Sequence, residues 1–173
     1  MNQIPLYKRT AEYAREHGEL EIYRASLNAN MACKEAIESA IRKHFDGMHL
    51  DEGAVSEALN AYGMERTCYV VANSVKRKSW DGRFSHANKE WADQFEIVGT
   101  DRPDYESRCQ FVVESHPAVF DGFINILRRE HLMEQALIRE KPSLYATLEK
   151  ARAQAKLRPQ TQVKTAKRKE PER

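Results

Sequence analysis

The sequence predicts an all-α fold, arranged as a single-domain bundle of six or seven helices. Apolar side chains recur every three or four residues through most of the chain, which is the period of an α-helix. Glycines and prolines are few, seven and six among 173 residues, and most of them fall between the periodic segments. The chain is 41% hydrophobic and 31% charged, which is typical of a globular protein long enough to form one core.

The first two helices are expected at residues 6–17 and 19–45. Gly18 lies between them, where a helix commonly ends on a residue with left-handed backbone. The second helix has the strongest signal in the chain. It lacks Gly and Pro, and it begins with Glu19 and Glu21, whose charges suit the positive end of a helix dipole. Its apolar stripe consists of Leu20, Tyr23, Leu27, Met31, Ile37, Ile41 and Phe45.

Two shorter helices follow at residues 52–62 and 64–78, with Gly63 closing the first. Asp51 is the expected N-cap. The acids around Gly47 lack the alternating oxygen ligands of a calcium loop, so this stretch is interpreted as a helix–turn–helix connection. The β-forming residues within 64–78 leave a strand as the alternative, but the length and apolar spacing of the segment favour a helix.

The remaining elements are separated by turn residues. They are a helix at 85–95 capped by Ser85, a minor β element near 109–113, and helices at 115–141 and 143–157. Pro117 occupies the favoured first turn of one helix, whereas Pro142 is expected to end it. The helical domain therefore covers residues 1–158.

The charge of the chain is unevenly distributed. The formal net charge is +2, yet residues 149–173 alone carry +6 and residues 1–148 carry −4. Residues 159–173 contain one valine and no larger apolar side chain, which predicts a disordered basic tail. Its cations are candidates for contacting nucleic-acid phosphates, and a solubilising tail or linker remnant is an equal alternative. They are Lys164, Lys167, Arg168 and Lys169.

Several classes of function leave no trace in the sequence. There is no phosphate-binding glycine loop, nucleophile elbow or zinc-protease motif. Cys33, Cys68 and Cys109 lie far apart, and His44 and His49 flank an expected helix end, so we expect buried thiols, no metal and no cofactor. No signal peptide or stretch of roughly 20 apolar residues is present. We expect a cytoplasmic protein that is not an enzyme.

Polar side chains within the helices have structural interpretations. Asn30 lies beside the apolar stripe of helix 19–45, and Asn73 interrupts a run of valines, so each is expected to be buried in part and hydrogen-bonded. The bond of Asn30 is expected to reach a neighbouring loop. Glu38, with Lys34 and Arg42 nearby, is interpreted as charge pairing on a solvated helix face.

The segment SWDGRFSHANKEWA at residues 79–92 holds both tryptophans of the chain around a turn. In one interpretation both indoles pack on one region of the core and pin the turn. In the other, Arg83 and Phe84 form an exposed tip above the tryptophans, as part of a partner-binding surface. Tryptophan and arginine are enriched at protein–protein hot spots. The candidate partner-binding residues are Trp80, Arg83, Phe84 and Trp91.

Several motifs together resemble an uncharacterised domain family. They are YAREHGEL at 13–20, YRAS at 23–26, CKEAI at 33–37, FDGMHL at 45–50, WDGRFS at 80–85, NKEWA at 88–92, SHP at 115–117 and RRE at 128–130. The resemblance covers roughly residues 6–140. Domains of this family occur on phages and conjugative elements of gut Gram-positive bacteria, and the resemblance assigns no activity or functional residue.

The resemblance implies a protein of a mobile genetic element. Small proteins of this origin include anti-CRISPR inhibitors, so we expect an interaction protein that binds the type II CRISPR RNA-guided nuclease with its guide RNA and blocks DNA loading or cleavage. A body charge of −4 is small for an inhibitor that mimics DNA. The alternatives are a nucleic-acid-binding accessory protein of a plasmid or phage, and a hydrolase acting on a defence component. Exposed aromatic side chains also suit a homo-oligomer.

Overall fold

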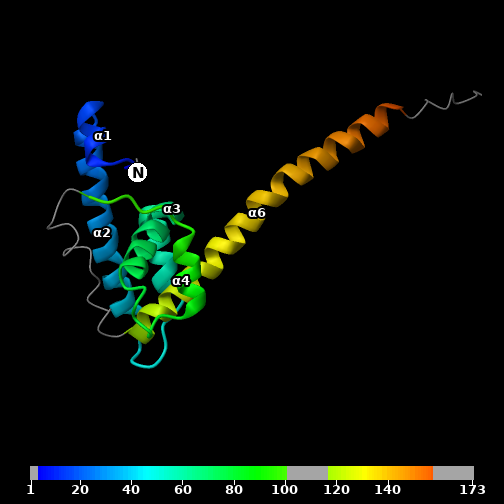
Figure 1. The fold of residues 1–173 in the computed structure, drawn as a ribbon. Coiled ribbons are helices and arrows are strands. Elements are labelled where there is room, and N and C mark those ends of the chain that lie inside the picture. Colours follow the sequence, from blue (N-terminus) through cyan, green and yellow to red (C-terminus); the bar gives the residue numbers. More distant parts are fainter. Residues whose placement is uncertain (1–3, 101–116, 158–173) are drawn as a thin grey trace, which may run out of the picture. The chain divides into compact units, whose positions relative to one another are not determined.

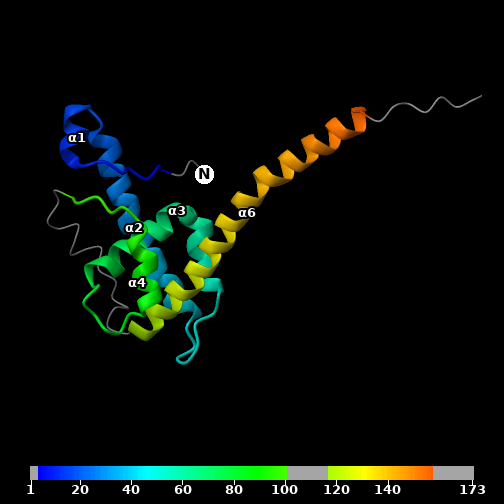
Figure 2. The ribbon, with the colours of Figure 1, turned by 45° about the vertical axis from the view of Figure 1, so that its right-hand side comes forward.

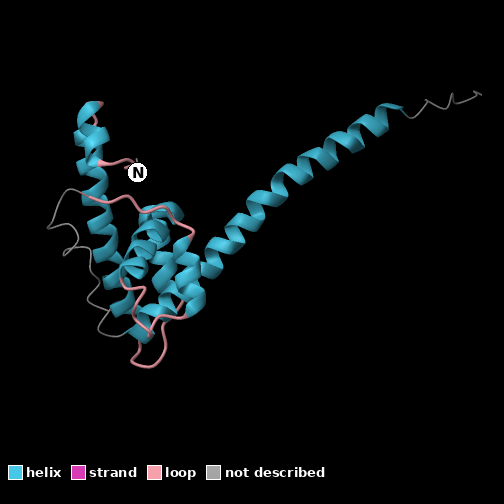
Figure 3. Ribbon diagram, viewed as in Figure 1, coloured by secondary structure: helices cyan, strands magenta, loops and turns pink. Residues whose placement is uncertain are grey.

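The computed structural model describes residues 4–100 and 117–157 of the chain. The expected β element at 109–113, Cys109 and the boundary and basic tail after residue 158 lie outside these residues. The described part contains five helices and no strand (Figures 1 and 3). They are α1 (Ala11–Glu16), α2 (Leu20–His44), α3 (Gly53–Arg77), α4 (His86–Asp93) and α6 (Pro117–Leu157). The all-α prediction is therefore confirmed, but the prediction of six or seven helices is not.

The break predicted at Gly63 is present, because the backbone there leaves the helical region with φ 75° and ψ 165°. Helical structure resumes directly after it, so the expected pair 52–62 and 64–78 forms the two arms of the kinked helix α3. The strand alternative for 64–78 is thereby excluded. The prediction that Pro142 ends a helix is wrong, because α6 continues through it. An internal proline removes one backbone hydrogen bond and crowds the preceding turn, which is why its propensity predicts a helix end.

Local hydrogen bonds fix the ends of the first helices. The Thr10 hydroxyl accepts from the Tyr13 N–H at 3.2 Å, so α1 begins at Ala11 rather than at residue 6. Gly18 has the expected left-handed backbone, with φ 70°. The Glu19 N–H donates to the Ala14 carbonyl at 2.8 Å, and the Gly18 N–H donates to the Arg15 carbonyl at 3.4 Å. This pair of bonds satisfies carbonyls at the end of α1 and turns the chain into α2.

The chain divides into two units, Met1–Met133 and Glu134–Arg173. In the first unit α2 and α3 lie side by side and pack along their lengths (Figures 1 and 2). The first turns of α6 contribute four fully buried side chains to its core, which are Phe120, Phe123, Ile124 and Leu127. A second apolar cluster joins α1 to α2. The second unit contains the rest of α6.

A buried arginine links three segments of the first unit. Arg66 of α3 is 5% exposed, and its guanidinium donates to the carbonyls of Ser26 at 3.0 Å and Ile4 at 2.7 Å. It also donates to the side-chain oxygen of Asn30. The burial and hydrogen bonding expected of Asn30 are confirmed, and this bond comes from α3.

Two further sequence interpretations concern α2 and α3. The charge pairing expected around Glu38 is present, with its carboxylate 3.2 Å from Lys34 and 3.5 Å from Arg42. The expected solvated face is wrong for Lys34 and Glu38, which are both buried. Asn73 is 7% exposed and accepts from the Arg77 Nε–H at 3.0 Å, as its position predicts. The cysteines of these helices are also buried, as expected.

Candidate interaction surface

The turn after α3 presents one tryptophan to solvent. Backbone bonds from Lys78 to Val75, Ser79 to Lys76 and Asp81 to Lys78 keep the chain winding in tight turns beyond the helix. Trp80 lies within these turns, and its side chain is among the most exposed large apolar groups of the described residues, at 79%. An indole left in water at this level is unusual, because aromatic surface gains free energy when it is covered.

The same turn carries an arginine held in a fixed position by a buried carboxylate. Asp81 is 6% exposed, and its oxygens lie 2.7–3.1 Å from Nε and Nη2 of Arg83. Asp81 also accepts from the Arg83 backbone N–H at 3.0 Å. These bonds to Arg83 lower the pKa of the Asp81 carboxyl to about 2. The Arg83 side chain nevertheless remains 59% exposed, so the guanidinium is oriented by Asp81 while it still faces solvent.

The other two candidate residues of this segment belong to the core. Phe84 is 3% exposed and packs edge-on against Phe120 of α6, with ring centroids 5.9 Å apart. Trp91 of α4 is 2% exposed, and its indole N–H donates to Nδ1 of His131 at 3.2 Å. The expectation of Phe84 at an exposed tip is therefore wrong. The alternative, in which both indoles are buried together, is wrong for Trp80.

Polar contacts attach the segment to the start of α6. The Ser85 N–H donates to the Asp121 carboxylate at 3.0 Å, and the Asn88 amide donates to the same carboxylate oxygen at 2.8 Å. Ser85 is the N-cap residue of α4, as predicted, but its hydroxyl makes no cap bond. Phe84 and these bonds attach the end of the turn to α6, and the turn itself carries Trp80 and Arg83.

Three cations precede the exposed Trp80 in the chain, and the sequence analysis did not single them out. Lys76 and Arg77 form the last turn of α3, and Lys78 follows as its C-cap. Lys76 donates to the Phe95 carbonyl at 2.9 Å, and Arg77 is exposed. Basic side chains at a helix C-terminus are usually interpreted as partners of the helix dipole. The pattern KRKSW at 76–80 therefore did not predict a binding surface.

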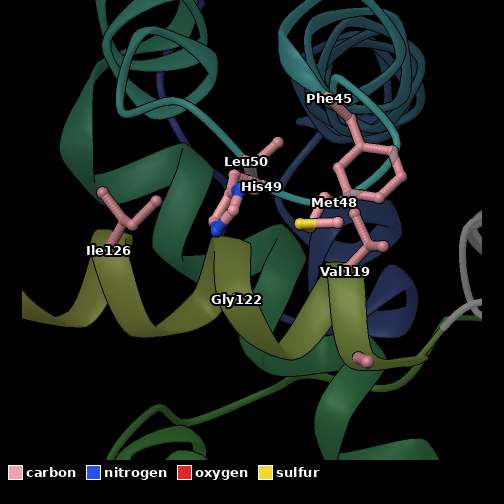
Figure 4. Close-up of a pocket in the computed structure, with 8 residues that line it drawn as sticks. Phe45, Met48, His49, Leu50, Val119, Gly122 and Ile126 are labelled. Carbon is pink, nitrogen blue, oxygen red and sulfur yellow. The ribbon is translucent and has the colours of Figure 1, made fainter.

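An apolar pocket of about 360 Å³, which no sequence pattern predicts, lies elsewhere on the first unit. The turn between α2 and α3 forms one wall and the start of α6 forms the other (Figure 4). The imidazole of His49 points toward Gly122 of α6, where the absence of a side chain leaves space. Asp46 shapes the turn by accepting from the backbone N–H groups of Met48 and His49 at 2.8 and 2.6 Å, which lowers its pKa. The lining residues are Phe45, Met48, His49, Leu50, Ala118, Val119, Gly122 and Ile126.

The described residues contain no group of three or more His, Cys, Asp or Glu side chains placed to hold a metal ion. In the same part of the chain, no helix is both long enough and apolar enough to cross a membrane. The proposed nucleic-acid contacts at Lys164, Lys167, Arg168 and Lys169 lie outside the described residues and stay a prediction.

Together, the fold and this surface define a small α-helical protein with a hydrogen-bonded, cationic turn that exposes one indole. The chain belongs to the family described as "Protein of unknown function (DUF3849)", whose model matches residues 6–132. The match covers most of the first unit and both walls of the pocket, and it is consistent with the expected uncharacterised domain family. No curated protein matches the sequence, and no solved structure matches it.

Proposed function

We propose that this protein is a non-enzymatic interaction protein of a mobile genetic element and that it binds its partner through the turn of residues 78–83. The exposed Trp80 carries the proposal. Its indole is 79% exposed, whereas Phe84 and Trp91 of the same segment are buried. Asp81 and Arg83 brace the turn, so little conformational entropy is lost when a partner covers it.

The expected partner is the type II CRISPR RNA-guided nuclease with its guide RNA. Support for this partner comes from the resemblance to domains carried by phages and conjugative elements, where inhibitors of this nuclease occur. An inhibitor of this kind would block DNA loading or the rearrangement that permits cleavage. The chain would then act at equal molar ratio with the nuclease, since it works by occupying a surface.

The proposal is tested with purified nuclease–guide particles. The wild-type chain is expected to co-elute with the particle on a sizing column and to stop DNA cleavage. Trp80→Ala is expected to weaken this binding at least about 30-fold, because truncating a central aromatic hot spot costs about 2 kcal/mol or more. Ile22→Ala is the matched control, because Ile22 is 49% exposed on α2, away from the turn. Co-elution that is the same for both variants and the wild type would refute the role of the turn.

A nucleic-acid-binding accessory protein is the second candidate, favoured by the net charge of +6 over residues 149–173. Such a protein would shift DNA or RNA in a gel without any nuclease, and rising salt would weaken the shift steeply. Truncation after residue 158 is expected to abolish that shift. Retention of the shift in the truncated chain would exclude the tail as its cause.

A further inference from the structure

The residues around Trp80 favour a particular chemistry for its partner. Lys76, Arg77, Lys78 and Arg83 bring four cations within eight residues, and Asp81 is the one acid in that span. Residues 1–148 as a whole carry a net charge of −4. The turn is therefore a local positive site on an otherwise acidic body, and it attracts a polyanion rather than a neutral surface.

These cations lie near Trp80 along the chain, and Asp81 fixes the direction of one of them, Arg83. The Asp81 N–H donates to the Lys78 carbonyl at 2.8 Å, which places Trp80 inside a tight turn between Lys78 and Asp81. Arg77 is exposed while its Nε–H donates to Asn73, and Lys78 is half-buried. Asp81 binds the Nε and Nη2 atoms of Arg83, and the 59% exposure of that side chain leaves part of its guanidinium open to solvent.

The residue types around Trp80 distinguish between an acidic protein surface and a nucleic acid as the partner. The buried centre of a protein–protein interface is depleted in lysine, although arginine is enriched there. An exposed aromatic ring ringed by Lys and Arg is instead the arrangement that binds single-stranded nucleic acid, in which a base stacks on the ring and cations contact the phosphates. Trp80 offers a ring face, and the neighbouring side chains offer the cations.

We infer that the surface formed by Arg77, Lys78, Trp80 and Arg83 binds unpaired nucleotides, with a base stacked on the Trp80 indole. This inference rests on the proposed function, because it assigns the contact of the turn to the nucleic-acid component of the partner particle. It is separate from the predicted tail contacts, which would involve phosphates alone.

The test uses the full chain and labelled single strands of about ten nucleotides, with a duplex of the same length for comparison. The tail is first neutralised by Lys164→Gln, Lys167→Gln, Arg168→Gln and Lys169→Gln, so that the turn is measured alone. Binding is followed by fluorescence anisotropy and by quenching of indole emission. The single strand is expected to bind several-fold tighter than the duplex and to quench the exposed indole. Trp80→Ala is expected to weaken single-strand binding about tenfold.

Each outcome decides between the two claims. Equal single-strand affinity of Trp80→Ala and its parent would overturn the inference, as would a polyglutamate peptide that binds with the same dependence on Trp80. If Trp80→Ala loses the nuclease particle while its affinity for single strands is unchanged, the inference fails and the proposed function stands. If Trp80→Ala loses single strands but keeps the particle, the proposed function fails and the inference stands. The control Ile22→Ala is expected to match the parent in both assays.

Discussion

The kink of α3 predicts that replacing glycine by alanine destabilises the protein at Gly63, although the same replacement stabilises it at Gly122 of α6. At Gly63 the backbone has φ 75° and ψ 165°, a region that is accessible almost only to glycine. Forcing an L side chain into that conformation costs about 1–3 kcal/mol. Gly63→Ala is therefore expected to lower the free energy of unfolding by about that amount.

Gly122→Ala is the matched control. Gly122 lies inside α6 with helical backbone, and a Cβ atom added there meets nothing within 4 Å. Alanine in a helix interior is favoured over glycine by about 0.5–1 kcal/mol, so this variant is expected to be more stable than the wild type. The two variants should differ by about 1.5–4 kcal/mol.

Urea unfolding followed by far-ultraviolet circular dichroism measures both changes. The midpoint should fall for Gly63→Ala and rise for Gly122→Ala, while the slope of the free energy against urea stays the same, because the surface exposed on unfolding is unchanged. In thermal unfolding each kcal/mol corresponds to about 2–4 °C for a chain of this length. A wild-type midpoint for Gly63→Ala would refute the argument that the kink requires glycine.

Three further predictions concern single side chains. Trp91→Ala is expected to lower the free energy of unfolding in urea by about 3–5 kcal/mol, because its ring is buried. Trp80→Ala is expected to change it by less than about 0.5 kcal/mol, because the Trp80 ring is exposed. Equal losses for the two variants would contradict the difference in exposure. The pKa of Asp81 is lowered from 3.8 to about 2 in the folded state, so the stability that its carboxylate contributes is present above about pH 4 and is lost as the pH falls toward 2. The difference in unfolding free energy between the wild type and Asp81→Asn should therefore shrink between about pH 4 and about pH 2. A difference that stays constant would exclude the carboxylate as its cause. Arg66→Ala leaves buried acceptors without their donor and is expected to lower the free energy of unfolding by about 2–4 kcal/mol. Its control is Lys8→Ala, which removes an exposed ion pair and is expected to change that free energy by less than about 0.5 kcal/mol. Similar values for the two variants would show that burial of the guanidinium has no effect.

Most of the helical fold could be predicted from the sequence because its signals are local. The period of apolar residues along α2, the left-handed Gly18 and the proline in the first turn of α6 each depend on neighbours within one or two turns. The same locality explains the errors. A proline within a segment marks a helix end by propensity, yet the backbone of α6 stays helical through Pro142.

The candidate surface could be predicted only in part, because burial depends on partners distant in the sequence. Nothing near Trp80 or Trp91 distinguishes their exposures. Trp91 is buried because side chains that include His131, 40 residues away, pack against its ring, and Phe84 is buried because Phe120 of α6 covers it. The pocket was missed for the same reason, since its two walls are separated by about 70 residues of chain. The basic residues before Trp80 were visible in the sequence, but their position at a helix end gave them an ordinary explanation.

The contacts of Arg66 have a consequence for the order in which the chain folds. Its bond to the Ile4 carbonyl spans 62 residues, and closing so long a loop is entropically unfavourable until α2 and α3 already hold the guanidinium in place. We therefore expect the residues before α1 to attach late, after the transition state, so that deleting residues 1–5 accelerates unfolding much more than it slows refolding. If stopped-flow kinetics show that this variant mainly refolds more slowly, the attachment occurs before the transition state instead.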